Sequence, residues 1–99
     1  RFSRISGYWN RTGDIEIDIV AFNEDSGDVL WGECKLNGNK FSAADALRLK
    51  EKAAKVPWRK GSRRDNYALF SAGDLSAGRK EALRRAGLIP LDLRDLLEG

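Results

Sequence analysis

Residues 15–22 read IEIDIVAF and residues 29–36 read VLWGECKL, and the segment NEDSGD at 23–28 joins them. Isoleucine alternates with acidic residues at the start of the first segment, which is typical of a β-strand with one buried face. The joining segment is rich in Asn, Asp, Ser and Gly, the residues that favour tight turns. The sequence therefore predicts an antiparallel hairpin, and the other expected elements extend it on both sides.

A third strand and a helix are expected next to this hairpin. Residues 4–9 read as a strand that ends at NRTG, residues 10–13, so the first three strands form an antiparallel meander. Ser42 and Asp45 have the spacing of a capping box, and the helix that begins there ends before Pro57. The helix positions expected to face the sheet are Ala43, Ala46, Leu47, Ala53 and Ala54.

The C-terminal part of the chain predicts a short strand, a second helix and a last strand. YALF at residues 67–70 reads as a buried strand, and because a helix separates it from the hairpin, it can pair in parallel with a hairpin strand. A serine can cap the helix expected over residues 77–86, which ends at Gly87. The final strand, 88–91, contains a proline without an amide donor and should lie at a sheet edge, and 94–98 should form a last helical turn.

Together these elements predict an α/β domain with a central mixed sheet. A three-strand antiparallel meander is followed by a crossover helix and a further strand of the same sheet, and helices flank the sheet. The chain has 99 residues, of which 41% are hydrophobic, which suffices for one modest core, so a single domain over residues 1–99 is expected. The chain has no methionine and opens on Arg1 in mid-pattern, so we expect it to be part of a longer polypeptide.

Composition excludes several kinds of site. Cys34 is the only cysteine and there is no histidine, so an internal disulfide, the usual zinc and haem sites, and Ser-His-Asp or Cys-His catalysis are excluded. The net charge of +3 is compatible with a phosphate-bearing partner. No apolar run approaches the roughly 20 residues that span a bilayer, and no signal peptide is visible. A soluble, cytoplasmic domain without membrane contact is expected.

Three charged residues of the hairpin interrupt its apolar pattern. Glu33 and Lys35 are two apart on one strand, so their side chains share a face, and the register can place Asp18 of the other strand beside them. Charges inside apolar strands must pair, bind an ion or reach water. Two carboxylates supply the oxygen ligands that Mg²⁺ prefers, and a lysine can position the attacking water. The alternative is a solvated cross-strand pair of Glu33 and Lys35 without a catalytic role.

The same residues carry a resemblance to a known family. EIDIVA at 16–21, followed after a turn by GECK at 32–35, resembles motifs II and III of the PD-(D/E)XK nuclease superfamily, whose core has the same order of strands and helix. More narrowly, GYW at 7–9, the EIDIV run, GECK and LFS at 69–71 look like the C-terminal domain of archaeal-type P-loop ATPases. The resemblance covers roughly residues 4–71.

This resemblance implies a restriction-endonuclease-like fold and a metal-dependent endodeoxyribonuclease that hydrolyses DNA phosphodiester bonds. It implies that Asp18 and Glu33 bind Mg²⁺ or Mn²⁺, that the Cys34 carbonyl oxygen adds a ligand, and that Lys35 assists the nucleophile. The expected partners are DNA and the ATPase portion of the same chain, and a homodimer is compatible with cutting two strands. Because superfamily members also serve in DNA binding or protein contacts, a catalytically silent module with the same fold is the alternative.

A basic loop follows the crossover helix. Trp58 and Gly61 are flanked by five basic residues, Lys55, Arg59, Lys60, Arg63 and Arg64, and such a basic-aromatic segment can bind a phosphate backbone. We therefore expect four of them, Arg59, Lys60, Arg63 and Arg64, to bind nucleic acid, the alternative being a solvated loop.

Several residues near the three charged ones are expected to lie in the core or at the rim of the site rather than to take part in catalysis. Cys34 should point to the opposite face of its strand and be a small, buried, unreactive core residue. Trp31 shares the face of the charged residues and could stack on a base, as could Tyr8 and Trp9, although core packing is expected for at least one of the three. Glu16 is interpreted as a carboxylate at the rim of the site.

Overall fold

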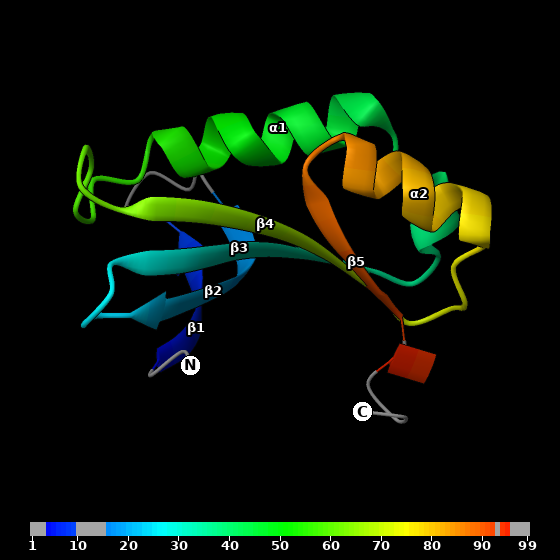
Figure 1. Ribbon diagram of the computed structural model, residues 1–99, viewed down its shortest axis with the longest axis horizontal. Helices are drawn as coiled ribbons and strands as arrows, with labels where there is room; N and C mark the ends of the chain where they lie inside the picture. Colours follow the sequence, from blue (N-terminus) through cyan, green and yellow to red (C-terminus); the bar gives the residue numbers. More distant parts are fainter. Residues whose placement is uncertain (1–3, 10–15, 93, 96–99) are drawn as a thin grey trace.

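The computed structural model describes residues 4–9, 16–92 and 94–95 (Figure 1). Its strands are β1 (Arg4–Trp9), β2 (Glu16–Asn23), β3 (Asp28–Lys35), β4 (Arg64–Ser71) and β5 (Leu88–Asp92). Its helices are α1 (Ala43–Ala54), α2 (Ala77–Arg85) and the short 3-10 helix η1 (Gly38–Lys40). Residues 94 and 95 are helical, and the remainder of the last turn predicted at 94–98 lies outside the described residues.

All five strands form one sheet in the order β1-β2-β3-β4-β5. β1, β2 and β3 are an antiparallel meander, β4 lies parallel to β3, and β5 lies parallel to β4 at the edge. α1 is the crossover between β3 and β4. The predicted α/β class, mixed sheet and edge position of the last strand are therefore confirmed, and β4 is longer than the four residues expected. No helix within the described part of the chain is both long and apolar enough to cross a membrane.

Both α-helices lie on one side of the sheet (Figure 1). α1 begins at the predicted capping box, in which the Asp45 N–H donates to the Ser42 hydroxyl and the Asp45 carboxylate accepts from the Ser42 N–H. The Ser76 hydroxyl caps α2 by accepting from the N–H of Arg79. Gly87 follows α2 with φ of +86°, the left-handed conformation that was expected where this helix ends.

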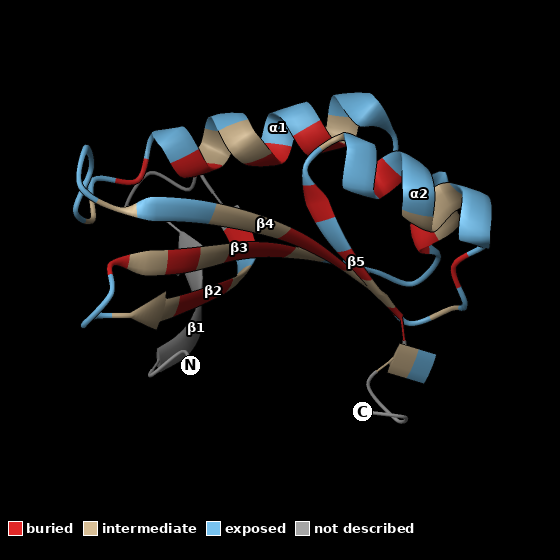
Figure 2. Cartoon of the chain, viewed as in Figure 1, coloured by how far each residue is buried: buried red, intermediate tan, exposed pale blue. Residues whose placement is uncertain are grey.

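The buried side of α1 differs in part from the predicted one. Ala46, Leu49 and Ala53 are buried against the sheet, as the red bands on α1 show (Figure 2). Leu47, predicted to face the sheet, is 58% exposed, and the alanines at 43 and 54 are exposed as well. Leu49 lies three residues after Ala46 and four before Ala53, so these three residues form one helical stripe from which Leu47 is displaced.

The helices and the sheet enclose one apolar core. The side chain of Trp31 is fully buried within that core and is not free to stack on a base. This confirms core packing for one of the three aromatic residues for which both alternatives were open. The side chains of Tyr8, Trp9 and Glu16 lie outside the described parts of the structure. Other large buried members of the core are Phe41, Leu49, Leu69, Leu75, Val20, Val29 and Val56.

Arg63 ties the basic loop to this core. Its guanidinium donates hydrogen bonds of 2.6–2.7 Å to three backbone carbonyl oxygens at the end of α1 and just beyond it, those of Ala53, Val56 and Trp58. It also pairs with Asp65 at 2.9 Å and lies over the ring of Trp31, and only 3% of its side chain is exposed. The positive charge and the N–H donors of Arg63 thus lie at the C-terminus of α1, where backbone carbonyl groups lack partners within the helix.

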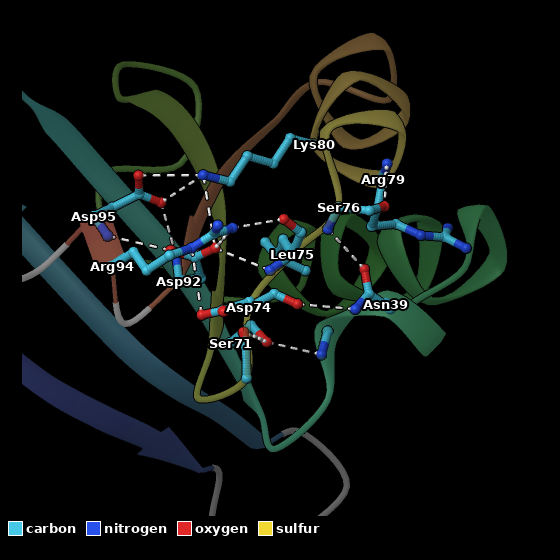
Figure 3. A network of polar contacts seen from close by, with 12 residues as sticks. Asn39, Ser71, Asp74, Leu75, Ser76, Arg79, Lys80, Asp92, Arg94 and Asp95 are labelled. Carbon is cyan, nitrogen blue, oxygen red and sulfur yellow. Dashed lines mark hydrogen bonds and ion pairs between the residues drawn. The ribbon is translucent and has the colours of Figure 1, made fainter.

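A second polar network joins the start of α2 to the end of β5 (Figure 3). The Asp92 carboxylate is fully buried and accepts hydrogen bonds of 2.9 Å from the Leu75 N–H and from the Arg94 guanidinium. Lys80 of α2 pairs at 3.1 Å with Asp95, whose carboxylate also accepts the Asp92 N–H. The Leu75 N–H and Arg94 together hold the pKa of the Asp92 carboxyl well below its usual range.

Arg63→Ala should lower the free energy of unfolding by roughly 3 kcal/mol or more, because it removes three hydrogen bonds to backbone carbonyl oxygens and the ion pair of a side chain that is only 3% exposed. The adjacent Arg64 provides a matched control, because its side chain is 69% exposed in its pair with Asp28. Arg64→Ala should leave the urea midpoint nearly unchanged. Urea denaturation measures both variants, and equal losses from the two substitutions would contradict the structural role of Arg63.

Candidate active site

β2 and β3 separate at one end of the sheet. Their pairing ends at Ile19 and Gly32, whereas β2 stays paired with β1 as far as its first residue. Beyond the last β2–β3 pair, a side chain takes over from the backbone, because Oδ2 of Asp18 accepts a hydrogen bond of 2.9 Å from the Cys34 N–H. The separation of the two strands therefore brings a carboxylate against the backbone of β3.

The three predicted site residues come together at this opening. Asp18, Glu33 and Lys35 line one cavity of about 320 Å³. Nζ of Lys35 lies 3.3 Å from Oε2 of Glu33, and 46% of the Lys35 side chain and 18% of the Glu33 side chain are exposed. Glu33 and Lys35 thus form an ion pair, but they do so in the wall of a cavity that also contains a second carboxylate.

A fourth residue, Lys52 of α1, lines the same cavity and is not identified by the sequence analysis. It lies in the last turn of the helix, three residues after Leu49 and next to Ala53, both of which are buried. Because Lys52 lies beside the buried stripe of α1, the sequence could have indicated that it is close to the sheet. That prediction requires knowing that Leu49, rather than Leu47, faces the sheet.

Gly32, directly before Glu33, allows close packing on the face of β3 opposite the carboxylates. A Cβ atom at this position would lie 2.9 Å from the ring of Phe70 and 3.2 Å from the Cβ atom of Ile19. Such contacts would force β3 away from its neighbours and displace Glu33. The glycine therefore helps to place the carboxylate that follows it.

Cys34 is exposed, so the prediction that it is a buried core residue is wrong. Both α-helices lie on the side of the sheet to which Trp31 points, and Cys34 points to the other side. Partial burial nevertheless raises the pKa of the Cys34 thiol, and the carboxylates of Asp18 and Glu33 raise it further. A raised pKa keeps the thiol protonated and a poor nucleophile, in line with an unreactive residue.

The oxygen donors of the cavity suit a hard divalent cation. Within residues 4–9, 16–92 and 94–95, no group of three or more histidine, cysteine or acidic residues is arranged to hold an ion. The cavity offers two carboxylates, those of Asp18 and Glu33. Mg²⁺ commonly takes one or two carboxylates from a protein and completes its shell with water and phosphate oxygens. The residues present therefore fit Mg²⁺ or Mn²⁺, with the Cys34 carbonyl oxygen remaining a predicted further ligand.

The basic loop lies at the other end of β3. The Arg64 N–H donates to the Gly27 carbonyl oxygen at 2.9 Å, and the Arg64 guanidinium pairs with Asp28 at 2.7 Å. Asp28 and Glu33 are the first and sixth residues of β3, a separation of about 17 Å along an extended strand. The cavity and the basic loop are therefore two separate places on the surface, which a strand of nucleic acid would have to bridge.

The four predicted nucleic-acid-binding residues differ in how accessible they are. Arg63 is buried and bonded within the protein, so its assignment to this surface is corrected. Arg64 is exposed but paired. Arg59 and Lys60 are exposed, and the Arg59 guanidinium lies 5.0 Å from the centre of the Trp58 ring. Arg59 and Lys60 are thus the members of the predicted set that are most free to meet a phosphate.

Among known proteins, one family model matches the chain. This model, described as "Archaea bacterial proteins of unknown function", matches residues 1–55. The matched segment includes β1, β2, β3 and α1, and with them the described residues that line the cavity. No curated protein and no solved structure matches the chain.

Mg²⁺ should shift the backbone amide signals of Asp18, Glu33 and Cys34, because their atoms surround the candidate ion site. Asp18→Asn should weaken that response by removing a negative ligand, while its remaining side-chain oxygen still accepts the Cys34 N–H and preserves the fold. Amide NMR spectra recorded during a Mg²⁺ titration measure both effects, and Asp25→Asn in the exposed turn is the control. Shifts spread over exposed acids, or unfolding of the Asp18→Asn variant, would point to an ordinary structural charge instead.

Proposed function

The chain belongs to the DUF234 family, and we propose that this domain is a divalent-metal-dependent nuclease that hydrolyses phosphodiester bonds in DNA. The observation that carries the proposal is the opening between β2 and β3, where Asp18, Glu33 and Lys35 line one cavity. Two carboxylates and a lysine from adjacent strands thus share one cavity, an arrangement that can bind a divalent cation together with a phosphate.

In this proposal Asp18 and Glu33 hold Mg²⁺ or Mn²⁺, together with the Cys34 carbonyl oxygen. When bound, such an ion supplies Lewis acidity and a water molecule of lowered pKa. Lys35 lies 3.3 Å from Glu33 and keeps 46% of its side chain exposed, so its ammonium group can reach an attacking water or a phosphate oxygen. Its positive charge then offsets the negative charge that develops on the phosphate.

The arrangement of the sheet supports a relation to the PD-(D/E)XK nucleases. The two carboxylates and Lys35 lie on adjacent antiparallel strands, β2 and β3, which a crossover helix and a parallel strand follow. This is the order implied by the resemblance in residues 16–21 and 32–35. We extend the proposal to a restriction-endonuclease-like module at the C-terminal end of a P-loop ATPase.

A catalytically silent DNA-binding module is the second candidate, and the basic loop favours it. Arg59 and Lys60 are exposed on a loop that Arg63 fixes to the end of α1. A fixed cationic surface can bind a phosphate backbone whether or not the acidic cavity holds an ion. Cleavage therefore distinguishes the two candidates, and binding alone does not.

Lys35→Ala should lower the rate of DNA cleavage by roughly 10²-fold or more, because it removes the group assigned to the water and the phosphate charge. The Mg²⁺ response of the Cys34 amide should persist, since Lys35 is not an ion ligand. Cleavage of single-stranded, duplex and branched DNA is measured with Mn²⁺, and Lys40→Ala, an exposed lysine of η1, is the control. If the wild-type protein cuts none of these substrates, or the Lys35→Ala variant cuts equally well, the nuclease proposal fails.

Charge reversal at both Arg59 and Lys60 should weaken DNA binding to a similar extent for all sequences and flatten its salt dependence, because both residues are assigned to phosphates rather than bases. Fluorescence anisotropy at several salt concentrations gives both quantities. Charge reversal at both Arg84 and Arg85, exposed residues of α2, lowers the net charge by the same amount and is the matched control. Unchanged affinity and an unchanged salt slope would remove the basic loop from the DNA-binding surface.

A further inference from the structure

Lys52 is a cation in this cavity for which the described part of the chain supplies no ion-pair partner. It lines the cavity together with Asp18 and Glu33. Lys35 is paired with Glu33 at 3.3 Å, whereas Lys52 takes part in no ion pair or side-chain hydrogen bond within the described part of the chain. An ammonium group offers donors and no acceptor, so Lys52 cannot serve as a ligand of a metal ion. The ammonium group of Lys52 is therefore available to an anionic ligand that enters the cavity.

The charges of the cavity point to the nature of that anion. Of the described residues that line it, two carry carboxylates and two carry ammonium groups, so their formal charges cancel. A divalent cation held by Asp18 and Glu33 would add two positive charges to the cavity. A phosphodiester carries one negative charge per phosphate, and a polynucleotide strand presents such charges in series. The loaded cavity is therefore complementary to the backbone of a polynucleotide.

The position of Lys52 is set by the helix rather than by a loop. Leu49 and Ala53, which flank it on α1, are both buried, so the backbone at Lys52 is held against the sheet. Lys52 is half-buried, which places its aliphatic stem along the protein and leaves the ammonium group at the cavity. Lys55, which follows α1 directly, is exposed and is not among the residues that line the cavity.

We infer that Lys52 binds a non-bridging oxygen of the substrate phosphate and so positions a polynucleotide strand over Asp18 and Glu33. This inference rests on the proposed nuclease function and deepens it by assigning the substrate-anchoring residue. Lys35 and Lys52 then have separate tasks: Lys35 acts beside Glu33 on the attacking side, and Lys52 holds the phosphate from α1. Loss of Lys52 should therefore weaken substrate binding and leave ion binding intact.

The test compares Lys52→Met, Lys52→Arg and Lys55→Met in the full chain. Methionine keeps an unbranched stem without the charge, and arginine keeps the charge. Affinity for a fluorescent single-stranded oligonucleotide is measured with Mn²⁺ in a Lys35→Ala background, in which cleavage is slowed by roughly 10²-fold or more and disturbs the measurement little. The Mg²⁺ shift of the Cys34 amide is recorded in the same variants as an independent measure of ion binding, and far-UV circular dichroism reports the fold.

Lys52→Met should raise the Kd for the oligonucleotide about tenfold and reduce its salt slope by about one, as expected for the loss of one phosphate contact. For Lys52→Arg and Lys55→Met, the Kd should stay within about twofold of that of the Lys35→Ala protein. The Mg²⁺-induced shift of the Cys34 amide should be the same in all variants. Should Lys52→Met not fold, Lys52→Gln takes its place.

Two results would overturn the inference in different ways. If Lys52→Met binds the oligonucleotide as tightly as Lys55→Met while the Cys34 amide still responds to Mg²⁺, Lys52 is not the anchor and the proposed nuclease function stands. If the wild-type Cys34 amide does not respond to Mg²⁺, the proposed function fails and the inference fails with it.

Discussion

The hydrogen bond from the Cys34 N–H to the Asp18 carboxylate holds the candidate site together, because it spans the gap where β2 and β3 separate. A backbone N–H in a sheet needs an acceptor, and here a side chain takes the place of the strand carbonyl. Asp18 is thereby fixed close to Glu33, although their like charges repel. The same separation opens the cavity to water, so two negative charges are tolerated next to an apolar core.

The fixed position of α1 over the sheet is the second constraint. The capping box at Ser42 sets where the helix begins, and the Arg63 guanidinium binds the carbonyl groups at its other end. Between these two points, Leu49 is buried in the core. The two lysines of the cavity therefore come from rigid elements, Lys35 from β3 and Lys52 from α1. Groups carried by strands and helices keep their geometry better than groups carried by loops.

The parts of the fold that depend on neighbours in the sequence are predictable from it, among them the hairpin, the capping box and the edge strand. The errors arise where a distant element decides. Alternation places Cys34 on the face opposite Glu33, but whether that face is covered depends on the side on which the helices pack. Arg63 resembles its neighbours in the basic loop, and only the fold brings Asp65 and the end of α1 around it. Lys52 enters the cavity only once the packing of its helix is known.

A crystal grown with Mn²⁺ and a short DNA strand, measured at the manganese absorption edge, tests the nuclease account most directly. The account predicts an anomalous peak bound by the carboxylates of Asp18 and Glu33, with an oxygen of a DNA phosphate on the same ion. A strand bound along the basic loop alone, with no ion between Asp18 and Glu33, would contradict it and would leave the domain as a DNA-binding module.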